Sequence, residues 1–352
     1  MKTKLFFLLF IFLFSTSCLF KKPELTPPAS QEDAVQKKIQ ELEEEIGRLS
    51  ENTENLKKFI DLLKANQDKF SDKFPESKLP IFIPEHIDFC GEEVPLNRFR
   101  VRERLEQALI IEMNRSAMCL VFLRSGRWLP LIEQKIKEMN LPEDLKYIAV
   151  IESDLDPEAY SYAGAAGLWQ FIRSTGKRYL KIDSYVDERL DPEKSTEAAL
   201  KHLAELYSEL GDWPSALAGY NMHKDRYKNA RTKERAQDFY AVRDIPNESL
   251  QYPFRAIAVK LIMEHPDKYG FPLLEEINQI KYQPYPAEAT IISVNYQTEK
   301  IVDIAKRLGM SYQEFRAFNS HILIKKNNYG EVVRAYLPKG KYKIYIFKKA
   351  IN

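Results

Sequence analysis

The chain has 352 residues, of which 44% are hydrophobic and 12% aromatic, with 53 basic and 51 acidic side chains. This length and apolar content allow two or three folded domains and exclude a disordered protein. A net charge of only +2 excludes a large field of one sign. We therefore expect no nucleic acid as a partner, and a neutral or mixed-charge polymer is the better candidate substrate.

Residues 1–17 are predicted to be a signal peptide. Two lysines precede an apolar run from Leu5 to Phe14, which is short for a membrane span. Small residues then lead to Cys18, which resembles the lipobox of bacterial lipoproteins, where the cysteine is acylated; Ser15 stands where leucine is usual. We predict a membrane-anchored lipoprotein of the cell envelope, on its periplasmic face. An ordinary cleaved signal and an uncleaved anchor are the alternatives.

Residues 18–75 are predicted to be a lipid-anchored spacer followed by a long helix. The spacer is rich in proline and polar residues. From Val35 to Leu63, apolar residues then recur at alternating spacings of four and three, interrupted only at Thr53, which is typical of a coiled-coil seam. The helix is either a stalk, which would make a homo-oligomer through residues 35–63 or serve as a spacer, or a helix packed on the protein's own body.

Residues 76–275 are predicted to form the main domain, nearly all helical, with breaks at four prolines: Pro130, Pro142, Pro157 and Pro192. Residues 287–346 are predicted to be a small α+β domain, with a strand at 290–294, helices at 299–308 and 312–318, and a strand at 332–337. The fold class is therefore mainly α.

Two cysteines remain once Cys18 is assigned to the lipid. Cys90 and Cys119 form either a disulfide or two buried thiols, since an exported protein permits both. Neither stands at metal-ligand spacing from a histidine. We predict no metal and no cofactor.

Glu152 is the candidate catalytic residue. It ends a helical stripe whose earlier members are apolar, and the other faces of this helix are apolar too: Leu145, Tyr147, Ile148, Ala149, Val150 and Ile151. Desolvation raises the pKa of such a carboxyl group. A carboxyl group that is protonated near neutral pH can serve as the general acid that protonates a glycosidic oxygen, as in lysozyme. On this pattern alone, an ion-paired structural glutamate is the alternative.

A turn rich in small residues follows, with the sequence SYAGAAGLWQF from Ser161. Gly164 and Gly167 allow the backbone to approach a ligand closely. Trp169 offers a flat face for a sugar ring, and Gln170 offers a donor and an acceptor for an N-acetyl or hydroxyl group. A core tryptophan and a surface glutamine are the alternatives.

Glu152-Ser153 followed by SYAGAAGLWQF resembles the goose-lysozyme-like transglycosylase domain of the membrane-bound lytic murein transglycosylase D family. The flanking segments SGRWLPLIEQKIKEMNLPEDLKYIAVIES and DERLDPEKSTEAALKHLAELYSELGDWPSALAGYN extend the resemblance over about residues 99–270. The resemblance implies a lysozyme-like helical domain that cleaves the β-1,4 bond between N-acetylmuramic acid and N-acetylglucosamine in peptidoglycan glycan strands. The products would carry 1,6-anhydromuramic ends.

In this family scheme Glu152 is the single acid and base, because the nucleophile is the substrate's own hydroxyl. Asp154 and Asp156 are then expected to face solvent or cap helices. The resemblance also implies a supporting carboxylate at Glu248 and a set of substrate-binding residues: Ser161, Gly164, Gly167, Trp169, Gln170, Tyr220, Asn221 and Tyr252.

One departure from the family follows Asn221, where Ala-Gly is usual and this chain has Met222-His223. His223 has no partner at triad spacing, so we interpret it as a surface or cleft-lining residue. The lost glycine supports an alternative function, a non-catalytic peptidoglycan-binding scaffold protein.

Residues 287–346 resemble a LysM domain, with a strand, a helix, a turn at Gly309 and a second helix ending at Asn319. LysM modules bind glycans that contain N-acetylglucosamine, so this unit is expected to hold the protein on the cell wall. It departs from the usual pattern at Ser320, where proline is typical, and in a longer segment at 325–330.

Overall fold

The computed structural model describes residues 81–282, 287–326 and 332–347, with a few helical positions between residues 54 and 61. One of these, Lys58, pairs with Glu54 at 2.9 Å. The signal peptide, Cys18 and the rest of the 35–63 seam lie outside the described residues, so those features stay predictions. Across the described ranges, no helix is both long enough and apolar enough to cross a membrane.

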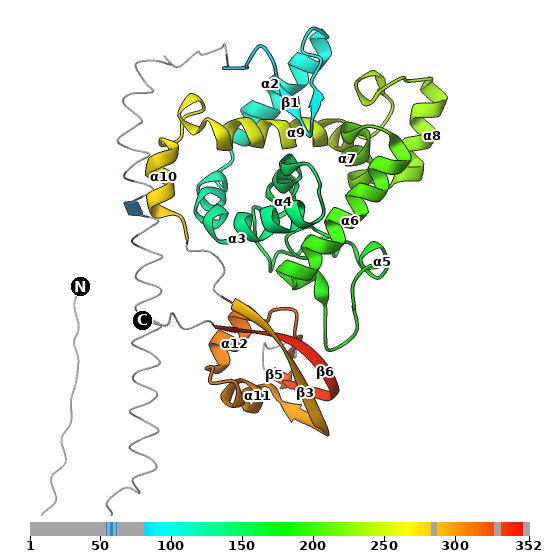
Figure 1. Cartoon of the computed structure of the whole chain (residues 1–352). Helices are drawn as coiled ribbons and strands as arrows, with labels where there is room; N and C mark the ends of the chain where they lie inside the picture. The colour runs from blue at the N-terminus through cyan, green and yellow to red at the C-terminus, as the bar shows by residue number, and fades with distance from the viewer. Residues whose placement is uncertain are drawn as a thin grey trace, which may run out of the picture. The chain divides into compact units, whose positions relative to one another are not determined.

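Helices dominate residues 81–282, as the sequence predicts (Figure 1). A short hairpin comes first, with strands β1 (Asp88–Phe89) and β2 (Glu92–Glu93). The longer helices are α2 (Phe99–Met113), α3 (Met118–Glu138), α4 (Lys146–Ser153), α6 (Pro192–Leu210), α7 (Trp213–Met222), α8 (Lys224–Glu234) and α9 (Asn247–Glu264). The short ones are η1 (Glu143–Leu145), α5 (Arg173–Gly176), η2 (Glu188–Leu190), η3 (Phe239–Ala241), η4 (Pro266–Lys268) and α10 (Leu274–Ile280).

Proline has two different effects in these helices. Pro192 begins α6, where its missing N–H is not needed, and Asp191 caps the helix by accepting two backbone N–H groups at 3.0 Å. Pro130 lies inside α3, so the predicted break there is wrong. The apolar stripe of α3 continues past the proline to Ile132 and Ile136, which are buried. This burial offsets the roughly 3 kcal/mol that a proline costs inside a helix.

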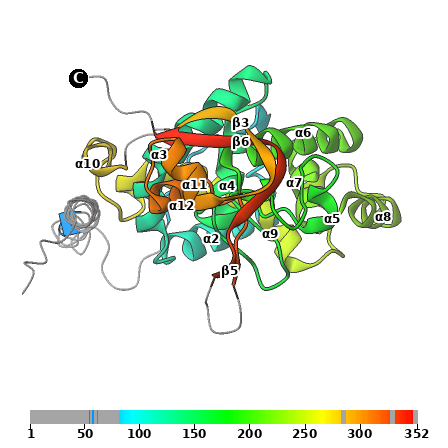
Figure 2. The ribbon, with the colours of Figure 1, turned by 90° about the horizontal axis from the view of Figure 1, so that it is seen from below.

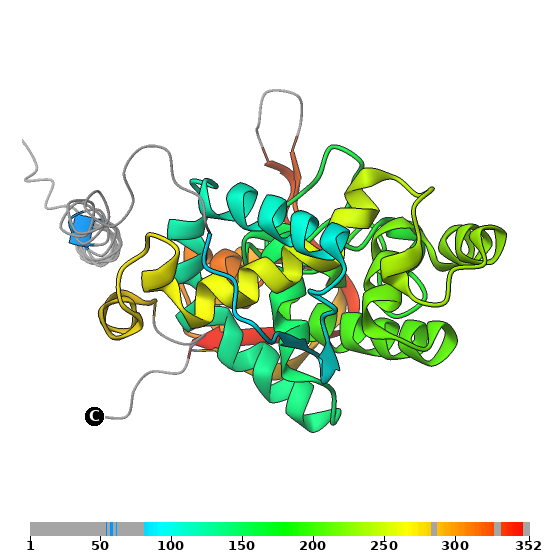
Figure 3. The same ribbon diagram turned by 90° about the horizontal axis from the view of Figure 1, so that it is seen from above.

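Helix α9 lies at the centre of the helical core. Helix α2, in cyan, runs beside α9, in yellow (Figure 3), and α4 and α7 also pack on α9. Most of its side chains are buried, among them Tyr252, Phe254, Ala256, Ile257, Ala258, Val259 and Ile262. Helix α9 therefore carries side chains to α4 and α7 on one face and to α2 on another.

The C-terminal unit has the predicted order of strand, two helices and strand. It contains β3 (Ala287–Lys300), α11 (Ile301–Arg307), α12 (Tyr312–Phe318), β4 (Lys325–Lys326), β5 (Val332–Arg334) and β6 (Tyr336–Phe347). Strands β3 and β6 pair antiparallel, with Thr290 opposite Ile344, and α11 and α12 lie beside this ribbon (Figure 2). The predicted end of the last strand at Leu337 is wrong. Tyr342 and Ile344 continue its buried face, and a register shift in β3 accommodates Pro338.

The segment 183–193 connects the C-terminal unit to the helical core. Its backbone forms a short strand-like pairing, in which Leu323 donates to the Tyr185 carbonyl at 2.8 Å and Asp187 donates to the His321 carbonyl at 2.9 Å. Tyr345 Oη also donates to Asp191 at 2.6 Å. The residue that caps α6 is therefore also a partner of β6.

Candidate active site

Glu152 lies in the last turn of α4, the helix whose apolar stripe the sequence analysis singles out. The helix ends after Ser153, because Asp154 turns into the left-handed backbone region at φ 55° and donates to the Val150 carbonyl. The residues before Glu152 are buried: Tyr147, Ile148, Ala149, Val150 and Ile151. Its carboxyl group is therefore held against an apolar helix, as predicted.

The carboxyl group of Glu152 meets Tyr252 of α9. Tyr252 Oη donates to Glu152 Oε1 at 2.5 Å. Burial raises the pKa of Glu152 to about 7; the hydrogen bond from Tyr252 and the charge of Arg255 oppose this rise, and the charge of Glu248 adds to it. A substantial fraction of the molecules therefore keeps a proton on Glu152 at neutral pH, which is the state that a general acid needs.

A chain of charges centred on the buried Glu112 holds Arg255 close to Glu152. Arg255 Nε donates to Glu112 at 2.7 Å, and Glu112, which is 0% exposed, also pairs with Arg115 at 3.1 Å. Arg115 continues the chain to Asp154 at 2.7 Å. Sequence reasoning missed Glu112, Arg115 and Arg255, because the pairings of Glu112 with Arg255 and of Arg115 with Asp154 join segments far apart in the chain and leave no local pattern.

Asn221 and Glu248 form a second polar pair near Glu152. Asn221 Nδ2 donates to Glu248 Oε1 at 3.5 Å, and Ser249 Oγ donates to Asn221 Oδ1 at 2.6 Å. Glu248 is exposed, yet its charge raises the pKa of Glu152. The structure therefore brings Asn221, Glu248 and Tyr252, all named from the sequence, together around the candidate acid.

The glycine turn, residues 161–171, is held by its own hydrogen bonds. Ser161 Oγ accepts a backbone N–H of the turn at 3.0 Å. Gln170 Nε2 donates to the carbonyls of Ala159 and Gly167 at 3.2 and 2.9 Å. Because both amide hydrogens of Gln170 are used in this way, only its amide oxygen is left to contact a ligand.

Arg189 fastens the glycine turn to the rest of the domain. Its Nη1 donates to the carbonyls of Gly164 and Phe171 at 2.8 and 2.9 Å. Its charge is paired with Asp187 at 2.7 Å, with the two side chains 5% and 4% exposed. No pattern in the sequence marks this pair, since a buried arginine is recognised only when its partners are known.

Comparison with known proteins identifies the segment that holds these groups. The family described as the transglycosylase SLT domain matches residues 130–242, which include Glu152, the glycine turn and Asn221. Residues 130–242 match the transglycosylase SLT domain, and we call this segment the SLT domain. The family resemblance seen in the sequence is confirmed in this respect.

Relatives of the SLT domain extend the match. Membrane-bound lytic murein transglycosylase D of Escherichia coli (strain K12) is 30% identical over 245 residues, which cover 66% of this chain and 51% of the relative. The chain thus spans about half the length of this curated relative. The 70 kDa soluble lytic transglycosylase of Escherichia coli has 20% identity and a TM-score of 0.36 over 49% of this chain and 32% of its own. An inactive mutant of the lytic transglycosylase Slt from Pseudomonas aeruginosa has 18% identity and a TM-score of 0.32 over 38% and 23%.

Two of the expected sugar-binding residues, one buried and one partly buried, have hydrogen-bond partners inside the SLT domain. Trp169 is 0% exposed and its Nε1 donates to Thr196 at 2.9 Å, so its indole has no face free for a sugar ring. The expected stacking role of Trp169 is therefore wrong, and the core alternative holds. Tyr220 Oη donates to the Trp169 carbonyl at 2.8 Å. Tyr220, a residue of α7, therefore stabilises the backbone of the glycine turn.

Gly167 is required for close packing rather than for ligand approach. A Cβ there would lie 1.8 Å from the Arg189 carbonyl oxygen, whereas a Cβ on Gly164 would meet nothing within 4 Å. Both glycines have a positive φ, 80° and 79°. Alanine substitutions at the two positions therefore distinguish the free-energy cost of the positive φ from that of the clash.

Gly167→Ala is expected to lower the free energy of unfolding by about 3 kcal/mol, because the clash with Arg189 adds to the strain of the positive φ. Gly164→Ala is the matched control, with an expected loss of about 1 kcal/mol from the backbone alone. Urea unfolding of the two full-length variants measures both. Equal losses would show that the packing against Arg189 is unimportant.

His223 sits in a backbone conformation that favours glycine. Its φ is 79° and its ψ is 125° at the junction between α7 and α8. Its imidazole is 70% exposed and lies 3.7 Å from Asp225. This geometry accounts physically for the glycine that is usual in the family at this position. It also agrees with the interpretation of His223 as a surface residue.

His223→Gly is expected to raise the free energy of unfolding by about 1 kcal/mol, because it relieves the strain of the positive φ and removes few contacts. His223→Ala is the control, since it removes the imidazole and keeps the strain. Urea denaturation of both variants tests the idea. Stabilisation of the alanine variant to the same degree would assign the effect to the side chain instead.

The two aspartates that follow Glu152 have structural partners. Asp154 pairs with Arg115, and Asp156 accepts from Arg124 at 3.0 Å and from the Glu158 backbone at 2.9 Å. Asp156 thus caps a turn as predicted, while the pairing of both carboxylates with arginine was not predicted.

Cys90 and Cys119 are free thiols. Among the described residues, no cluster of ligands could hold a metal ion.

Proposed function

We propose that this protein is a lytic transglycosylase that cleaves the β-1,4 bond between N-acetylmuramic acid and N-acetylglucosamine in peptidoglycan. The observation that carries the proposal is the carboxyl group of Glu152, which has a pKa of about 7 and accepts a hydrogen bond from Tyr252. The SLT domain around it, and a relative named as a lytic murein transglycosylase, support the same chemistry.

In the first proposed step, Glu152 gives its proton to the glycosidic oxygen as the bond from this oxygen to C1 of the muramic residue breaks. The N-acetylglucosamine unit leaves with a hydroxyl group. The positive charge that develops at C1 lies near the carboxylate that has just formed, and Tyr252 stabilises this carboxylate by its hydrogen bond.

In the second proposed step, the Glu152 carboxylate removes the proton from the 6-hydroxyl of the same muramic residue. The 6-oxygen bonds to C1 and closes a 1,6-anhydro ring. Glu152 ends protonated, ready for the next strand, and no water is consumed. One carboxyl group is sufficient for both steps, so the engagement of Asp154 and Asp156 with arginine is compatible with catalysis.

Glu248 would act in this scheme through its charge. Its carboxylate accepts from Asn221 and raises the pKa of Glu152. A hydrolase would instead need a second carboxylate to activate a water molecule. Mass analysis of fragments from purified peptidoglycan digested by the wild type separates the two reactions. We expect anhydro ends; reducing ends that contain one more water would overturn the transglycosylase in favour of a hydrolase.

A second candidate function is a non-catalytic peptidoglycan-binding scaffold protein. The strained backbone at His223, beside Asn221, is the observation that favours it. Such a protein would sediment with insoluble peptidoglycan and release no fragments. The same digestion therefore decides between the two functions, with sedimentation as its second readout.

We further propose that the protein is held at the cell envelope by acylation of Cys18 and that residues 287–346 bind wall glycan. The relative is named as membrane-bound, which supports an envelope location. Labelling with palmitate tests the anchor, since Cys18→Ala should lose the label and leave the membrane fraction.

Crosslinking of the full chain tests a homo-oligomer through residues 35–63.

A further inference from the structure

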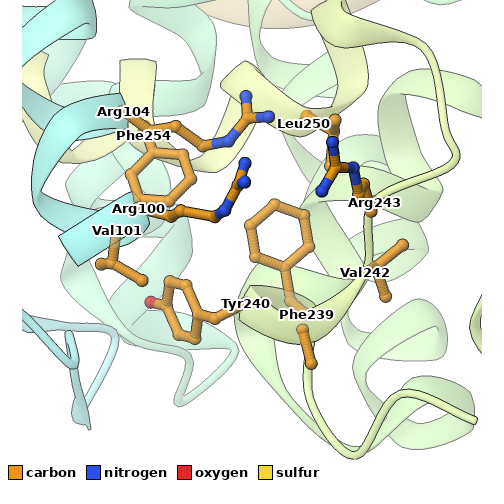
Figure 4. Close-up of a pocket in the computed structure, with 10 residues that line it drawn as sticks. Arg100, Val101, Arg104, Phe239, Tyr240, Val242, Arg243, Leu250 and Phe254 are labelled. Atoms are coloured by element: carbon orange, nitrogen blue, oxygen red, sulfur yellow. The ribbon is translucent and has the colours of Figure 1, made fainter. Parts of the chain in front are cut away.

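Three arginines converge on a hollow between α2, η3 and the start of α9. Arg100 and Arg104 come from α2, and Arg243 comes from the segment between η3 and α9. The hollow has a volume of about 290 Å³. Their guanidinium groups point toward one another above the ring of Phe239 (Figure 4). We call this feature the arginine pocket.

No acidic side chain lines the arginine pocket, and the Glu234 carboxylate beside it accepts the backbone N–H of Arg243 at 2.6 Å rather than its guanidinium group. None of its three arginines forms an ion pair with a carboxylate of the described ranges. The partners of two of them are uncharged: Arg100 lies 5.4 Å from the Phe99 ring centre, and Arg104 donates to the Asn247 amide oxygen at 3.4 Å. The nearby Asp238 is already engaged by Arg98 at 2.8 Å. Like charges held together in this way favour an incoming anion.

Two further features favour an anion with an apolar neighbour. The side chains of Phe239, Leu250 and Phe254 line the hollow beneath the arginines. Helix α9 starts without a side-chain cap, so its first N–H groups add a partial positive charge at this end. Burial, together with the charges of Arg100 and Arg243, lowers the pKa of Arg104. A bound anion would relieve this repulsion.

The arginine pocket and the candidate acid share the start of α9. Leu250 and Phe254 face the pocket, while Glu248 and Tyr252, two residues away on the helix, face Glu152. The thickness of one helix, about 10 Å, therefore separates the two. A peptide must pass around the helix rather than through it, a path of roughly 15 Å along half its circumference, which about five extended residues cover at roughly 3.3 Å per residue.

We propose that the arginine pocket binds a carboxylate of the peptide that muramic acid carries, while the glycan strand lies at Glu152. This inference rests on the proposed function. Peptidoglycan is a neutral glycan decorated with short peptides, which contain alanine methyl groups and end in carboxylates. The methyl groups match the apolar floor and the carboxylate matches the guanidinium groups. The enzyme would thereby prefer strands that keep their peptides.

The test measures binding in the full-length Glu152→Gln background, so that the substrate is not cut during the assay. Co-sedimentation compares insoluble peptidoglycan with glycan strands from which an amidase has removed the peptides. Adding Arg243→Gln or Arg100→Gln is expected to weaken binding to peptide-bearing material about tenfold, the effect of losing one charge-assisted hydrogen bond. Binding to peptide-free strands is expected to be unchanged.

Arg102→Gln is the matched control, because Arg102 lies on α2, is half exposed and, among the residues that the structure describes, pairs with Glu106 alone at 3.3 Å. Equal weakening on both glycans, or equal weakening by Arg102→Gln, would overturn the proposal. Co-sedimentation with phosphatidylglycerol vesicles is measured in the same way. If Arg243→Gln weakens binding to these vesicles and leaves binding to peptidoglycan unchanged, the proposal is overturned and the pocket is assigned to a lipid phosphate. A wild type that forms no anhydro ends would overturn the proposed function and leave this binding readout intact.

Discussion

Glu152→Gln is expected to abolish cleavage of peptidoglycan strands, with a loss of at least about a thousandfold in rate, because glutamine can neither give nor take the proton. The substitution keeps the size of the side chain and an acceptor for the Tyr252 hydroxyl. Binding of the strand should therefore survive. Release of soluble fragments from purified peptidoglycan measures the rate, and co-sedimentation measures the binding.

The same substitution should make the fold more stable at alkaline pH. Burial raises the pKa of Glu152 from the ordinary value of 4.5 to about 7, so the unfolded chain releases this proton at a lower pH than the folded protein. Wild-type stability therefore falls between pH 4.5 and 7 by about 3 kcal/mol from this group and then levels off. Glutamine does not ionise, so the advantage of the variant should grow over this interval.

Thermal unfolding of both proteins at pH 4.5, 6 and 8 measures this difference. A constant difference across the series would mean that Glu152 has an ordinary pKa. A variant that unfolds earlier at every pH would indicate a structural glutamate, the alternative that the helix pattern left open. Residual cleavage with unchanged products would move the acid role to another residue.

Tyr252→Phe is expected to shift the pH profile of cleavage upward and to lower its rate. The hydrogen bond at 2.5 Å favours the ionised form of Glu152, so its removal raises the pKa of that carboxyl further. Activity that needs protonated Glu152 then persists to higher pH. The rate itself should fall about tenfold to a hundredfold, because the carboxylate formed in the first step loses a charge-assisted hydrogen bond.

Tyr220→Phe is the control for Tyr252→Phe. Both are tyrosines near Glu152, with Tyr252 buried and Tyr220 partly buried, but the Tyr220 hydroxyl donates to the Trp169 carbonyl at 2.8 Å. Its loss should cost stability and leave the position of the alkaline limb unchanged. An equal shift in both variants would attribute the effect to general loosening of the site.

The sequence anticipated the candidate acid because its signal is local. The stripe that ends at Glu152 and the small residues of the glycine turn all lie between residues 145 and 167, so helical periodicity and turn chemistry can be recognised from neighbouring residues. The same periodicity located the two helices of the C-terminal unit. It failed at Pro130, because burial of the residues beyond the proline overrides the local cost.

Trp169 shows where local patterns mislead. Its place between the glycine turn and Gln170 suggested a platform for a sugar ring, whereas contacts with distant residues, such as the hydrogen bond to Thr196, place it in the core. A sequence lists which side chains offer an aromatic face but not which faces are covered. Which aromatic faces are covered depends on helices that follow later in the chain and pack against them.

The sequence by itself determined that this chain is mainly helical, that its acid candidate ends an apolar helix and that a tight turn of small residues follows. These properties come from residues that are neighbours along one helix or turn. Only the tertiary structure decided which groups set the pKa of that acid. Tyr252, Arg255 and Glu248 all belong to α9, about one hundred residues away from Glu152. Their electrostatic effect on the pKa of Glu152 depends on distances in space, and the packing of the helices sets these distances.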